Sequence, residues 1–396
     1  MPLFTSDIEI ADEYPTIEPS LRLDFANSRA LDSSMKFLRA SSATYVGEDG
    51  HIRTVVENEP RFDHDPTTGE SLGLLIEEER TNFFENSETV GGTATGDFFR
   101  GKEIHNKAAN INQFYFASDL ANYNIQAGDV YTLTGFIRAG SQTGNILIRW
   151  IDALNAPVSG VNNFSYTPTT DGEFVSFEFT FSQTFSGSCN CALTGSSGDD
   201  ADFAIMQLEK GSLPTSYIPT NGSTAIRYAD LVYSDTSKFL SPGEGTIITK
   251  FTWLNIGTPG AYGKVLFSLN KIGGFGNGIY VSNEPSQTST SIRILNNSNA
   301  EFSEDLFTIN PDPTELTIAI AYEKDNVGIS KNGGSVLVDS SATIPTMERL
   351  VVGDNAWGLD AGSGYSNQLN PGNCHIKSFI YYPKRLVNNQ LRSLTQ

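Results

Sequence analysis

The run from Glu173 to Phe181 (EFVSFEFTF) is the stretch that most constrains the fold. Aromatic and β-branched side chains fill most of its positions, and the whole chain is rich in Phe (25) and Tyr (15). Such residues favour the pleated surface of a β-strand. Similar short runs recur between clusters of Gly, Asn, Asp and Pro, which supply turn conformations. No stretch has the period of a long amphipathic helix, so the sequence predicts an all-β protein.

Residues 83–230 are predicted to form one antiparallel β-sandwich. Their strand-like runs are separated at intervals typical of hairpins, a rhythm that indicates this architecture. The segment Leu213–Asp230 is punctuated by Pro, Gly and Ser, so we interpret it as the linker that ends the domain. The predicted strands are Gln113–Ala117, Val130–Arg138, Ile146–Asp152, Glu173–Phe181 and Asp202–Leu208.

Residues 231–396 are predicted to form a second sandwich, of the jelly-roll type. The Asn332–Gly334 segment (NGG) is a strong hairpin turn. After the last strand, Val387, Leu391 and Leu394 are spaced as on one face of a short helix. The predicted strands are Gly245–Leu254, Lys264–Leu269, Gly278–Ser282, Ser291–Leu295, Glu315–Tyr322, Val327–Ser330, Val336–Asp339, Arg349–Gly353 and His375–Tyr382.

Residues 21–82 are predicted to form a smaller β unit ahead of the two tandem sandwiches. Leu21, Leu23 and Phe25 alternate with more polar residues, as in a half-buried strand. A hairpin over Arg61–Asn82, broken at its Pro-Thr-Thr-Gly turn, closes the unit. Short strands give so small a unit a marginal core, so it is expected to pack on a neighbour or a sister subunit.

Residues 1–20 are acidic and lack the apolar pattern of a folded unit. Pro15 and Pro19 favour extended backbone there. Two interpretations stay open: an unstructured terminus, or a tether that becomes ordered on a partner.

The formal net charge of -20 restricts the classes of partner. A surface of this sign repels phosphate groups, so nucleic-acid binding and adhesion to anionic lipid are disfavoured. No apolar run approaches the roughly 18 residues of a membrane span, and the first twenty residues lack the basic and apolar regions of a signal peptide. We therefore expect a soluble protein without membrane insertion.

The cysteines and histidines predict neither a disulfide nor a metal site. Cys189 and Cys191 are separated by one residue, a poor spacing for a disulfide in an extended strand. The 4 histidines show no ligand spacing. We expect Cys189, Cys191 and Cys374 to be reduced thiols, and we expect neither metal nor cofactor.

Two acidic clusters invite a catalytic or metal-binding interpretation. In Asp63-His64-Asp65, neighbouring side chains of an extended segment point to opposite faces, so His64 does not share a face with the carboxylates. Asp65 precedes Pro66, which favours a turn. The cluster at Asp199–Asp202 lacks the spacing of a calcium loop, so we favour a solvated acidic turn over a calcium site.

The loop 353–372 (GDNAWGLDAGSGYSNQLNPG) is the candidate glycan-binding site. Aromatic rings stack on the apolar faces of sugars, and Asn and Asp bind sugar hydroxyls. Loops at the rim of a sandwich commonly carry binding residues. Alternatively, the tryptophan of this loop covers the sandwich edge; Trp150 and Trp253 lie in strand patterns and are predicted core. The candidates are Asp354, Asn355, Trp357, Asp360 and Tyr365, with Tyr262 from a second loop.

The first unit resembles a module of bacteriophage virion proteins, including tail-fibre and head-fibre proteins. The motifs that carry this resemblance are LDFANSRALD, FLRASSATYVGEDG, EPRFDHDP and TGESLGLLIEEERTN. The end of the second unit, MQLEKGSLPTSYIPTNGSTAIRYAD, is similar to the closing strand and exit linker of carbohydrate-binding-module-like sandwiches in such proteins. The third unit resembles concanavalin A-like and laminin G-like jelly rolls through KVLFSLN, ELTIAIAYEKDNVGISKNGG and its C-terminal CHIKSFIYYPKRLVNNQLRSLTQ.

This resemblance implies a virion component, assembled in the host cytoplasm, that forms a homotrimer or another symmetric oligomer. It implies attachment to host-surface glycans, with residues 1–20 as the anchor to other virion proteins. No catalytic set is placed by the resemblance, so we expect no enzymatic activity. Two alternatives stay open: a capsid or tail decoration protein without a receptor, and a glycan-degrading depolymerase.

Overall fold

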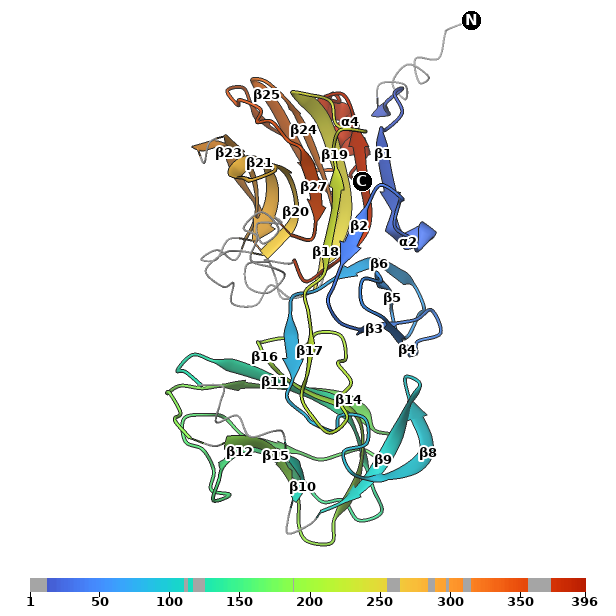
Figure 1. Cartoon of the computed structure of the whole chain (residues 1–396), viewed down its shortest axis with the longest axis vertical. Helices are drawn as coiled ribbons and strands as arrows, with labels where there is room; N and C mark the ends of the chain where they lie inside the picture. The colour runs from blue at the N-terminus through green and yellow to red at the C-terminus, as the bar shows by residue number, and fades with distance from the viewer. Residues whose placement is uncertain are drawn as a thin grey trace, which may run out of the picture. The chain divides into compact units, whose positions relative to one another are not determined.

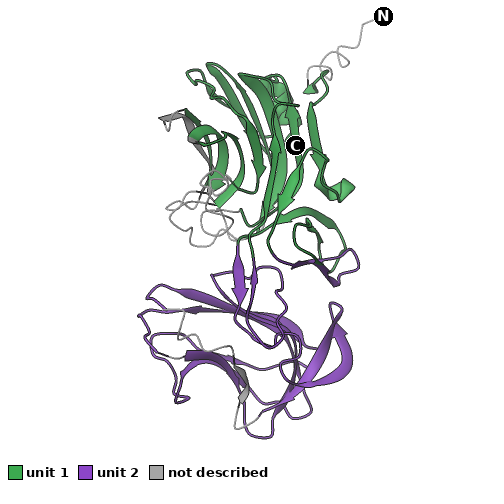
Figure 2. Cartoon of the chain, in the orientation of Figure 1, with its two compact units in different colours: residues 1–40, 55–78, 228–396 green, residues 41–54, 79–227 purple. Residues whose placement is uncertain are grey.

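The computed structural model describes residues 13–109, 113–116, 125–187, 189–254, 264–283, 289–296, 299–308, 315–354 and 372–396. It forms two compact units (Figure 2). Unit 1 comprises Met1–Ala40, Val55–Glu78 and Tyr228–Gln396, and unit 2 comprises Ser41–Thr54 and Glu79–Arg227. Each unit is a β-sandwich in the described residues, which confirms the predicted all-β class (Figure 1).

Unit 1 is built on an eight-stranded and a seven-stranded sheet, in which the described neighbours pair antiparallel. The eight-stranded sheet has the order β26 (Leu337–Asp339), β25 (Asn326–Lys331), β24 (Glu315–Glu323), β19 (Glu244–Trp253), β28 (Cys374–Tyr382), β6 (Ser71–Ile76) and β5 (Phe62–His64), with β1 (Leu21–Asp24) also paired to β28. The seven-stranded sheet has the order β2 (Lys36–Leu38), β18 (Leu231–Asp235), β27 (Arg349–Val352), β20 (Lys264–Lys271), β21 (Gly274–Asn283), β22 (Ser289–Asn296) and β23 (Asn299–Thr308).

The core of unit 1 lies between these two sheets. Alternate residues of β19, Ile247, Phe251 and Trp253, point into it, together with Leu266 of β20 and Ile376 of β28. Burying a side chain of this size contributes about 2 kcal/mol. The prediction that Trp253 is a core residue is confirmed, since only 5% of it is exposed.

Strands of the predicted unit 21–82 are distributed over larger sheets. β1 and β6 both pair with β28, and β2 pairs with β18, so these N-terminal strands extend the sheets of the C-terminal sandwich. Residues 41–54 belong to unit 2, where β3 (Ala43–Val46) pairs with β4 (Ile52–Val55). The physical reason is length, because strands of three to six residues bury too little surface to stand alone.

Unit 2 is built on a five-stranded and a four-stranded sheet. The first has the order β14 (Glu173–Thr180), β11 (Val130–Ala139), β16 (Asp200–Lys210), β9 (Lys102–Ala108) and β8 (Thr93–Phe99). The second has the order β10 (Gln113–Phe116), β15 (Cys189–Thr194), β12 (Ile146–Asp152) and β13 (Phe164–Tyr166).

Trp150 is the centre of the core of unit 2, as the sequence predicts. Its ring centroid lies 5.2 Å from that of Tyr131 and 5.0 Å from that of Phe181, both in edge-to-face geometry. This arrangement places the positive edge of one ring on the negative face of another. Cys189 and Cys191 lie in the same core, and both are free thiols, as is Cys374 in unit 1. The prediction of reduced cysteines is confirmed.

The predicted linker Leu213–Asp230 contains the boundary between the units, after Arg227, and is packed over part of its length. β17 (Ala225–Arg227) pairs with β7 (Arg80–Asn82), and Tyr217 and Ile218 are buried. Turn residues mark an irregular backbone equally well whether it is exposed or packed.

The two described helices are short. α2 (Phe25–Ser28) follows β1, and α4 (Asn388–Ser393) confirms the helix predicted from the spacing of Val387, Leu391 and Leu394. Leu391 packs with Ile248 and Ala321 of the eight-stranded sheet, on the face opposite the main core. Within the described ranges, no helix has the length and apolar character needed to cross a membrane.

Candidate functional site

A pocket of about 420 Å³ opens on unit 1. It lies where β2 meets β18 and where the start of β27 approaches the turn after β20. Most of the residues that line it have polar side chains, whereas most of the surface that they present to it is apolar. The lining residues are Ser33, Ser34, Lys36, Tyr233, Ser234, Asp235, Lys238, Ile272, Glu348 and Arg349.

The alternation of β18 places Tyr233 in this pocket. Val232 points into the main core, whereas Tyr233 packs on the other face of the sheet with Leu231 and Val351. Tyr233 is half-buried and pairs in register with Lys36 of β2, whose Nζ lies 5.7 Å from the ring centroid. The pocket therefore has one aromatic surface with an ammonium group beside it.

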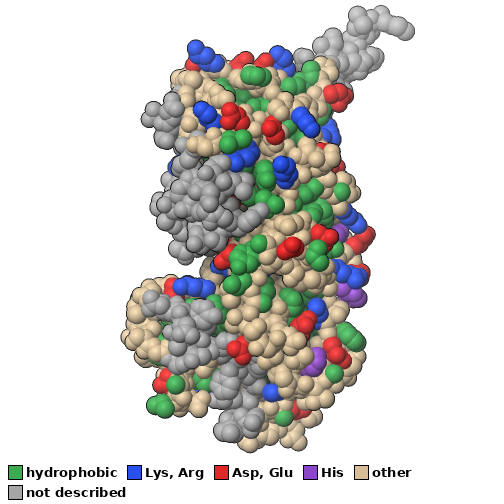
Figure 3. Space-filling model, viewed as in Figure 1, with side chains coloured by type: hydrophobic (Ala, Val, Ile, Leu, Met, Phe, Trp, Pro, Cys, Tyr) green, Lys and Arg blue, Asp and Glu red, His purple; other side chains and the backbone are tan. Residues whose placement is uncertain are grey.

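Charged groups of both signs face the pocket. Asp235 accepts a hydrogen bond of 2.7 Å from the Ser237 backbone N–H; hydrogen bonds from Ser237 lower the pKa of Asp235, with smaller contributions from Lys238 and Lys36. Glu348 accepts from the Ile272 backbone N–H at 3.1 Å. Cations and carboxylates are likewise interspersed on the face of the molecule in Figure 3.

Arg349 forms the most buried charged wall of the pocket, with 6% of its surface exposed. Its Nε and Nη2 donate to Asn270 Oδ1, each at 3.3 Å. This contact fixes the guanidinium relative to β20. A pocket with an aromatic surface, hydroxyls, donors and acceptors suits a polyhydroxylated ligand.

Of the sequence-predicted glycan loop, the described residues Gly353 and Asp354 follow the end of β27 that is opposite to the pocket. Arg349 begins β27 in the pocket, and Asp354 follows its other end. Asp354 is fully buried, and its backbone carbonyl accepts a hydrogen bond of 3.1 Å from Ser268. The other candidates, Asn355, Trp357, Asp360, Tyr365 and Tyr262, lie outside the described residues.

The hairpin interpretation of Asp63-His64-Asp65 is confirmed. Asp65 Oδ1 accepts from the backbone N–H groups of Thr67 and Thr68, so it shapes the turn between β5 and β6. Asp63 Oδ2 lies 2.8 Å from Nε2 of His375 on β28, while the neighbouring His64 is buried. Asp63 and His64 therefore have different surroundings, as expected for neighbours in a strand.

The carboxylates of the acidic cluster at Asp199–Asp202 accept hydrogen bonds within unit 2, and only Asp202 among Asp199, Asp200 and Asp202 is buried. Asp200 accepts from the Gln142 N–H at 2.6 Å, and this contact helps lower its pKa against the effect of burial. Asp202 is 6% exposed and lies 2.8 Å from Arg138. The predicted turn is present, since the Asp199 N–H donates to the Ser196 carbonyl at 3.1 Å, but Asp202 lies buried in β16 instead of in solvent. Nowhere in the described ranges do three His, Cys, Asp or Glu side chains gather to hold a metal ion.

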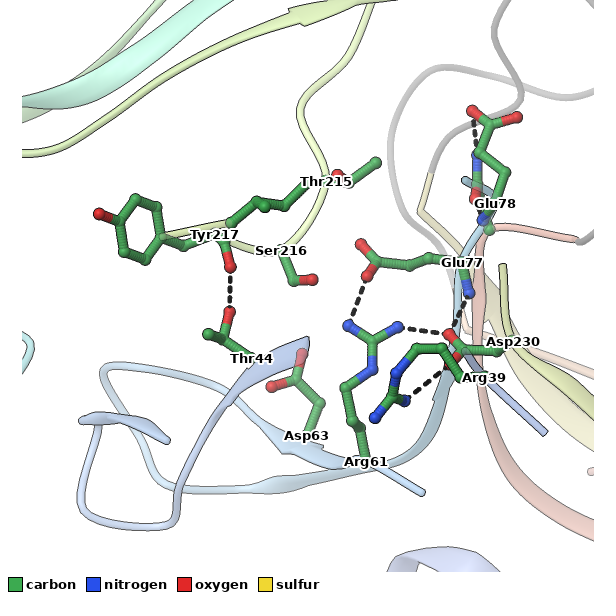
Figure 4. A network of polar contacts seen from close by, with 12 residues as sticks. Arg39, Thr44, Arg61, Asp63, Glu77, Glu78, Thr215, Ser216, Tyr217 and Asp230 are labelled. Atoms are coloured by element: carbon green, nitrogen blue, oxygen red, sulfur yellow. Dashed lines mark hydrogen bonds and ion pairs between the residues drawn. The ribbon is translucent and has the colours of Figure 1, made fainter. Parts of the chain in front are cut away.

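A buried ionic network lies elsewhere in unit 1 (Figure 4). Asp230 binds Arg39 Nη1 at 3.0 Å and also binds Arg61 Nη2, while Arg61 Nη1 lies 2.6 Å from Glu77. Burial would lower the pKa of Arg61, but the charges of Asp230 and Glu77 outweigh it and raise that pKa. We assign the network a structural role, because its members are 0–3% exposed.

No family model matches this chain, and no curated protein matches its sequence. Among the solved structures to which parts of it are similar are the following three. The CBM40 domain of the Ruminococcus gnavus IT-sialidase bound to α2,6-sialyllactose has a TM-score of 0.31 and 12% identity over 39% of this chain and 85% of that chain. Domain 4 of AbnA, an arabinanase of Geobacillus stearothermophilus, in complex with arabinotriose, has a TM-score of 0.30 and 13% identity over 47% of this chain and 83% of that chain. Mouse laminin α1 domains LG4-5 have a TM-score of 0.27 and 10% identity over 78% of this chain and 89% of that chain. These likenesses identify no ligand and no activity for this chain.

Proposed function

We propose that this chain is a structural protein of a bacteriophage particle, a fibre or spike subunit that attaches to host-surface glycans and cleaves no bond in them. The glycan-binding part of the proposal rests on the pocket around Tyr233. The virion part rests on the sequence motifs of residues 21–82.

The pocket supports glycan binding through the kinds of group that it brings together. The ring of Tyr233 offers an apolar surface to a pyranose, and the hydroxyl groups of Ser33 and Ser34 lie among the lining residues. Lys36 and Glu348 add a donor and an acceptor for sugar hydroxyls. A volume of about 420 Å³ lies within the range of small-molecule sites.

Binding of the full chain to host-surface polysaccharide on a glycan array tests this proposal. Tyr233→Ala is expected to weaken binding at least tenfold, the equivalent of about 1.4 kcal/mol, whereas Tyr233→Phe keeps the ring and retains most of the affinity. Tyr14→Ala, an exposed tyrosine of the same unit, is the matched control.

The outcomes separate the alternative functions. Loss of binding in Trp357→Ala but not in Tyr233→Ala moves the site to the 353–372 loop. Absence of all glycan binding favours a decoration protein without a receptor. New reducing or unsaturated ends after incubation with host polysaccharide indicate a depolymerase and contradict the non-enzymatic assignment.

Deletion of residues 1–20 tests the virion role. The anchoring function predicts that the truncated chain folds, binds glycan and is absent from assembled particles. A symmetric oligomer, with a trimer favoured, is expected for the full chain in sedimentation analysis. Normal incorporation of the truncated chain would contradict the anchor.

A further inference from the structure

Three polar side chains of unit 1 meet outside the pocket: Lys264, Glu78 and Asn373. Lys264 is the first residue of β20 in the seven-stranded sheet. Asn373 comes directly before β28 in the eight-stranded sheet, and Glu78 lies shortly after β6, the neighbour of β28. The Glu78 carboxylate therefore bridges an amine from one sheet and an amide from the other.

Glu78 contacts both partners of this amine and amide pair. Its Oε2 binds Lys264 Nζ directly, and its Oε1 accepts a hydrogen bond of 2.9 Å from Asn373 Nδ2. Its backbone N–H donates to Asn373 Oδ1 at 2.7 Å. One residue thus touches the amine nitrogen, the amide nitrogen and the carbonyl oxygen. In Figure 4 the side chain of Glu78 points away from the neighbouring Arg61 network.

The surroundings of the three residues limit access of water. Asn373 is 1% exposed, and the side chains of Lys264 and Glu78 are 13% and 18% exposed. The backbone carbonyl of Asn373 accepts a hydrogen bond of 2.9 Å from Leu254 N–H, which fixes the chain at this point. Trp253 and Cys374 border the adjoining Gly372. Fixed, desolvated reactants are the conditions under which a weak nucleophile reacts with an amide.

Burial also favours the reactive form of the lysine. It lowers the pKa of Lys264 to about 8, against the opposing charge of Asp354. The neutral amine, with a free electron pair, is therefore a larger fraction of Lys264 near neutral pH than of an ordinary lysine with a pKa of about 10.4, although the Glu78 carboxylate in contact with Nζ favours the charged form.

We propose that Lys264 and Asn373 join in an intramolecular isopeptide bond, formed by the protein itself. The neutral Nζ of Lys264 attacks Cγ of Asn373, and the Glu78 backbone N–H stabilises the negative charge that develops on Oδ1. The Glu78 carboxylate takes a proton from Nζ and delivers it to Nδ2. The Cγ–Nδ2 bond breaks, ammonia leaves, and a secondary amide joins Nζ to Cγ. The step needs no oxidant or reductant.

The bond would connect β20 to the residue directly before β28, and so would join the two sheets of the unit 1 sandwich covalently. Lys377 is a useful comparison within the same unit. It lies 2.8 Å from Glu70 and 2.7 Å from Glu315, so it has carboxylate partners on both sides. Its described contacts place no amide carbonyl beside it, and no bond is expected there.

Intact-mass spectrometry of the purified full chain tests the proposal. The wild-type chain is expected to be lighter than its sequence mass by one ammonia molecule, and protease digestion is expected to yield a branched peptide containing Lys264 and Asn373. Lys264→Arg and Glu78→Gln are expected to have their full sequence masses, whereas Lys377→Arg keeps the ammonia deficit.

The wild-type measurement decides the question even where a variant fails to fold. A wild-type chain of full sequence mass that gives separate linear peptides after prolonged incubation at about pH 8 overturns the proposal. Loss of water instead of ammonia also overturns it, because Lys264 would then be joined to a carboxylate such as Glu78 or Asp354.

Discussion

The two units fasten distant parts of the chain with different chemistry. In unit 1, Asp230 and Glu77 bind two arginines in a buried ionic network. In unit 2, Asn82 connects distant segments through hydrogen bonds to neutral groups. Its Nδ2 donates to the carbonyl of Ile218 at 2.8 Å, and its Oδ1 accepts from the N–H groups of Phe84 and Leu208 at 3.0 and 3.1 Å.

Equally buried polar groups can therefore differ in how much stability is lost when one of them is replaced. Removing one member of an ionic network leaves its partner as an uncompensated charge in a medium of low dielectric constant. Removing a neutral group leaves unsatisfied hydrogen-bonding groups, each of which costs less. Unit 1 is therefore expected to tolerate a single change in its network less well than unit 2.

The largest effect is expected for Asp230→Asn in unit 1. The change leaves the guanidinium groups of Arg39 and Arg61 without the carboxylate that binds both. It should lower the free energy of unfolding of unit 1 by about 3–5 kcal/mol. Hydrogen exchange of β28 peptides in increasing denaturant measures this, and Glu57→Gln at an exposed site of the same unit is the control. A loss below about 1 kcal/mol would mean that Glu77 alone satisfies the network.

Asn82→Ala is expected to have a smaller effect, confined to unit 2. It removes the partner of the Phe84 and Leu208 N–H groups and should cost about 2 kcal/mol. Exchange of β16 peptides reports the change, while β28 peptides remain as in wild type. A cost equal to that of Asp230→Asn would refute the distinction between ionic and neutral networks.

Tyr217→Phe should have a still smaller effect. The Tyr217 hydroxyl lies 2.7 Å from Ser87 Oγ, and both residues are buried. Loss of this single hydrogen bond is expected to cost about 1 kcal/mol. Thermal unfolding followed at unit 2 peptides measures it, with Tyr45→Phe as the control. No change in stability would indicate that water replaces the hydroxyl.

Glu209→Gln tests a fully buried carboxylate of unit 2 whose pKa is raised. Burial is the main cause, opposed by Arg80 and by hydrogen bonds from Thr215. The protonated form is therefore favoured more in the folded than in the unfolded state. Its stabilising contribution is full below the unfolded pKa of about 4.3 and is lost as pH rises through the higher folded pKa.

The Glu209→Gln variant should lack this pH-dependent loss. The difference in unfolding free energy between the variant and the wild-type chain, measured from about pH 4 to pH 8, reports it. A difference that stays constant over this range would show that Glu209 titrates alike in both states. Glu178→Gln, at an exposed position of β14, provides the comparison.

Strong local patterns predicted many strands correctly. Ile146–Asp152 matches β12 at both ends, and Val130–Arg138 lies within β11. β8 and β9 were missed because their exposed, polar residues alternate weakly. They form because they pair with each other and β9 pairs with β16. This information lies in partners distant in sequence.

The pocket could not be predicted for the same reason. Its walls come from residues 33–36, 233–238, 272 and 348–349, which meet only through the registers of β2, β18 and β27. Lys264 and Asn373 are likewise far apart in sequence, because strands β21 to β27 lie between them. The sequence did contain one signal for the buried ionic network. Arg39 and Arg61 each lie beside apolar residues, and a charge buried there requires an acidic partner from elsewhere in the chain.

The pairing of β1 with β28 also governs when unit 1 can be completed during translation. β1 leaves the ribosome long before its partner strand β28, which is among the last described parts of the chain to be made. Most of unit 2, Glu79–Arg227, is synthesised between them and can fold first. During that interval the backbone groups of β1 lack the strand with which they pair. Neighbouring nascent chains on one messenger RNA can then pair with each other through β1. A slow elongation rate would lengthen this exposure and lower the yield of correctly folded protein.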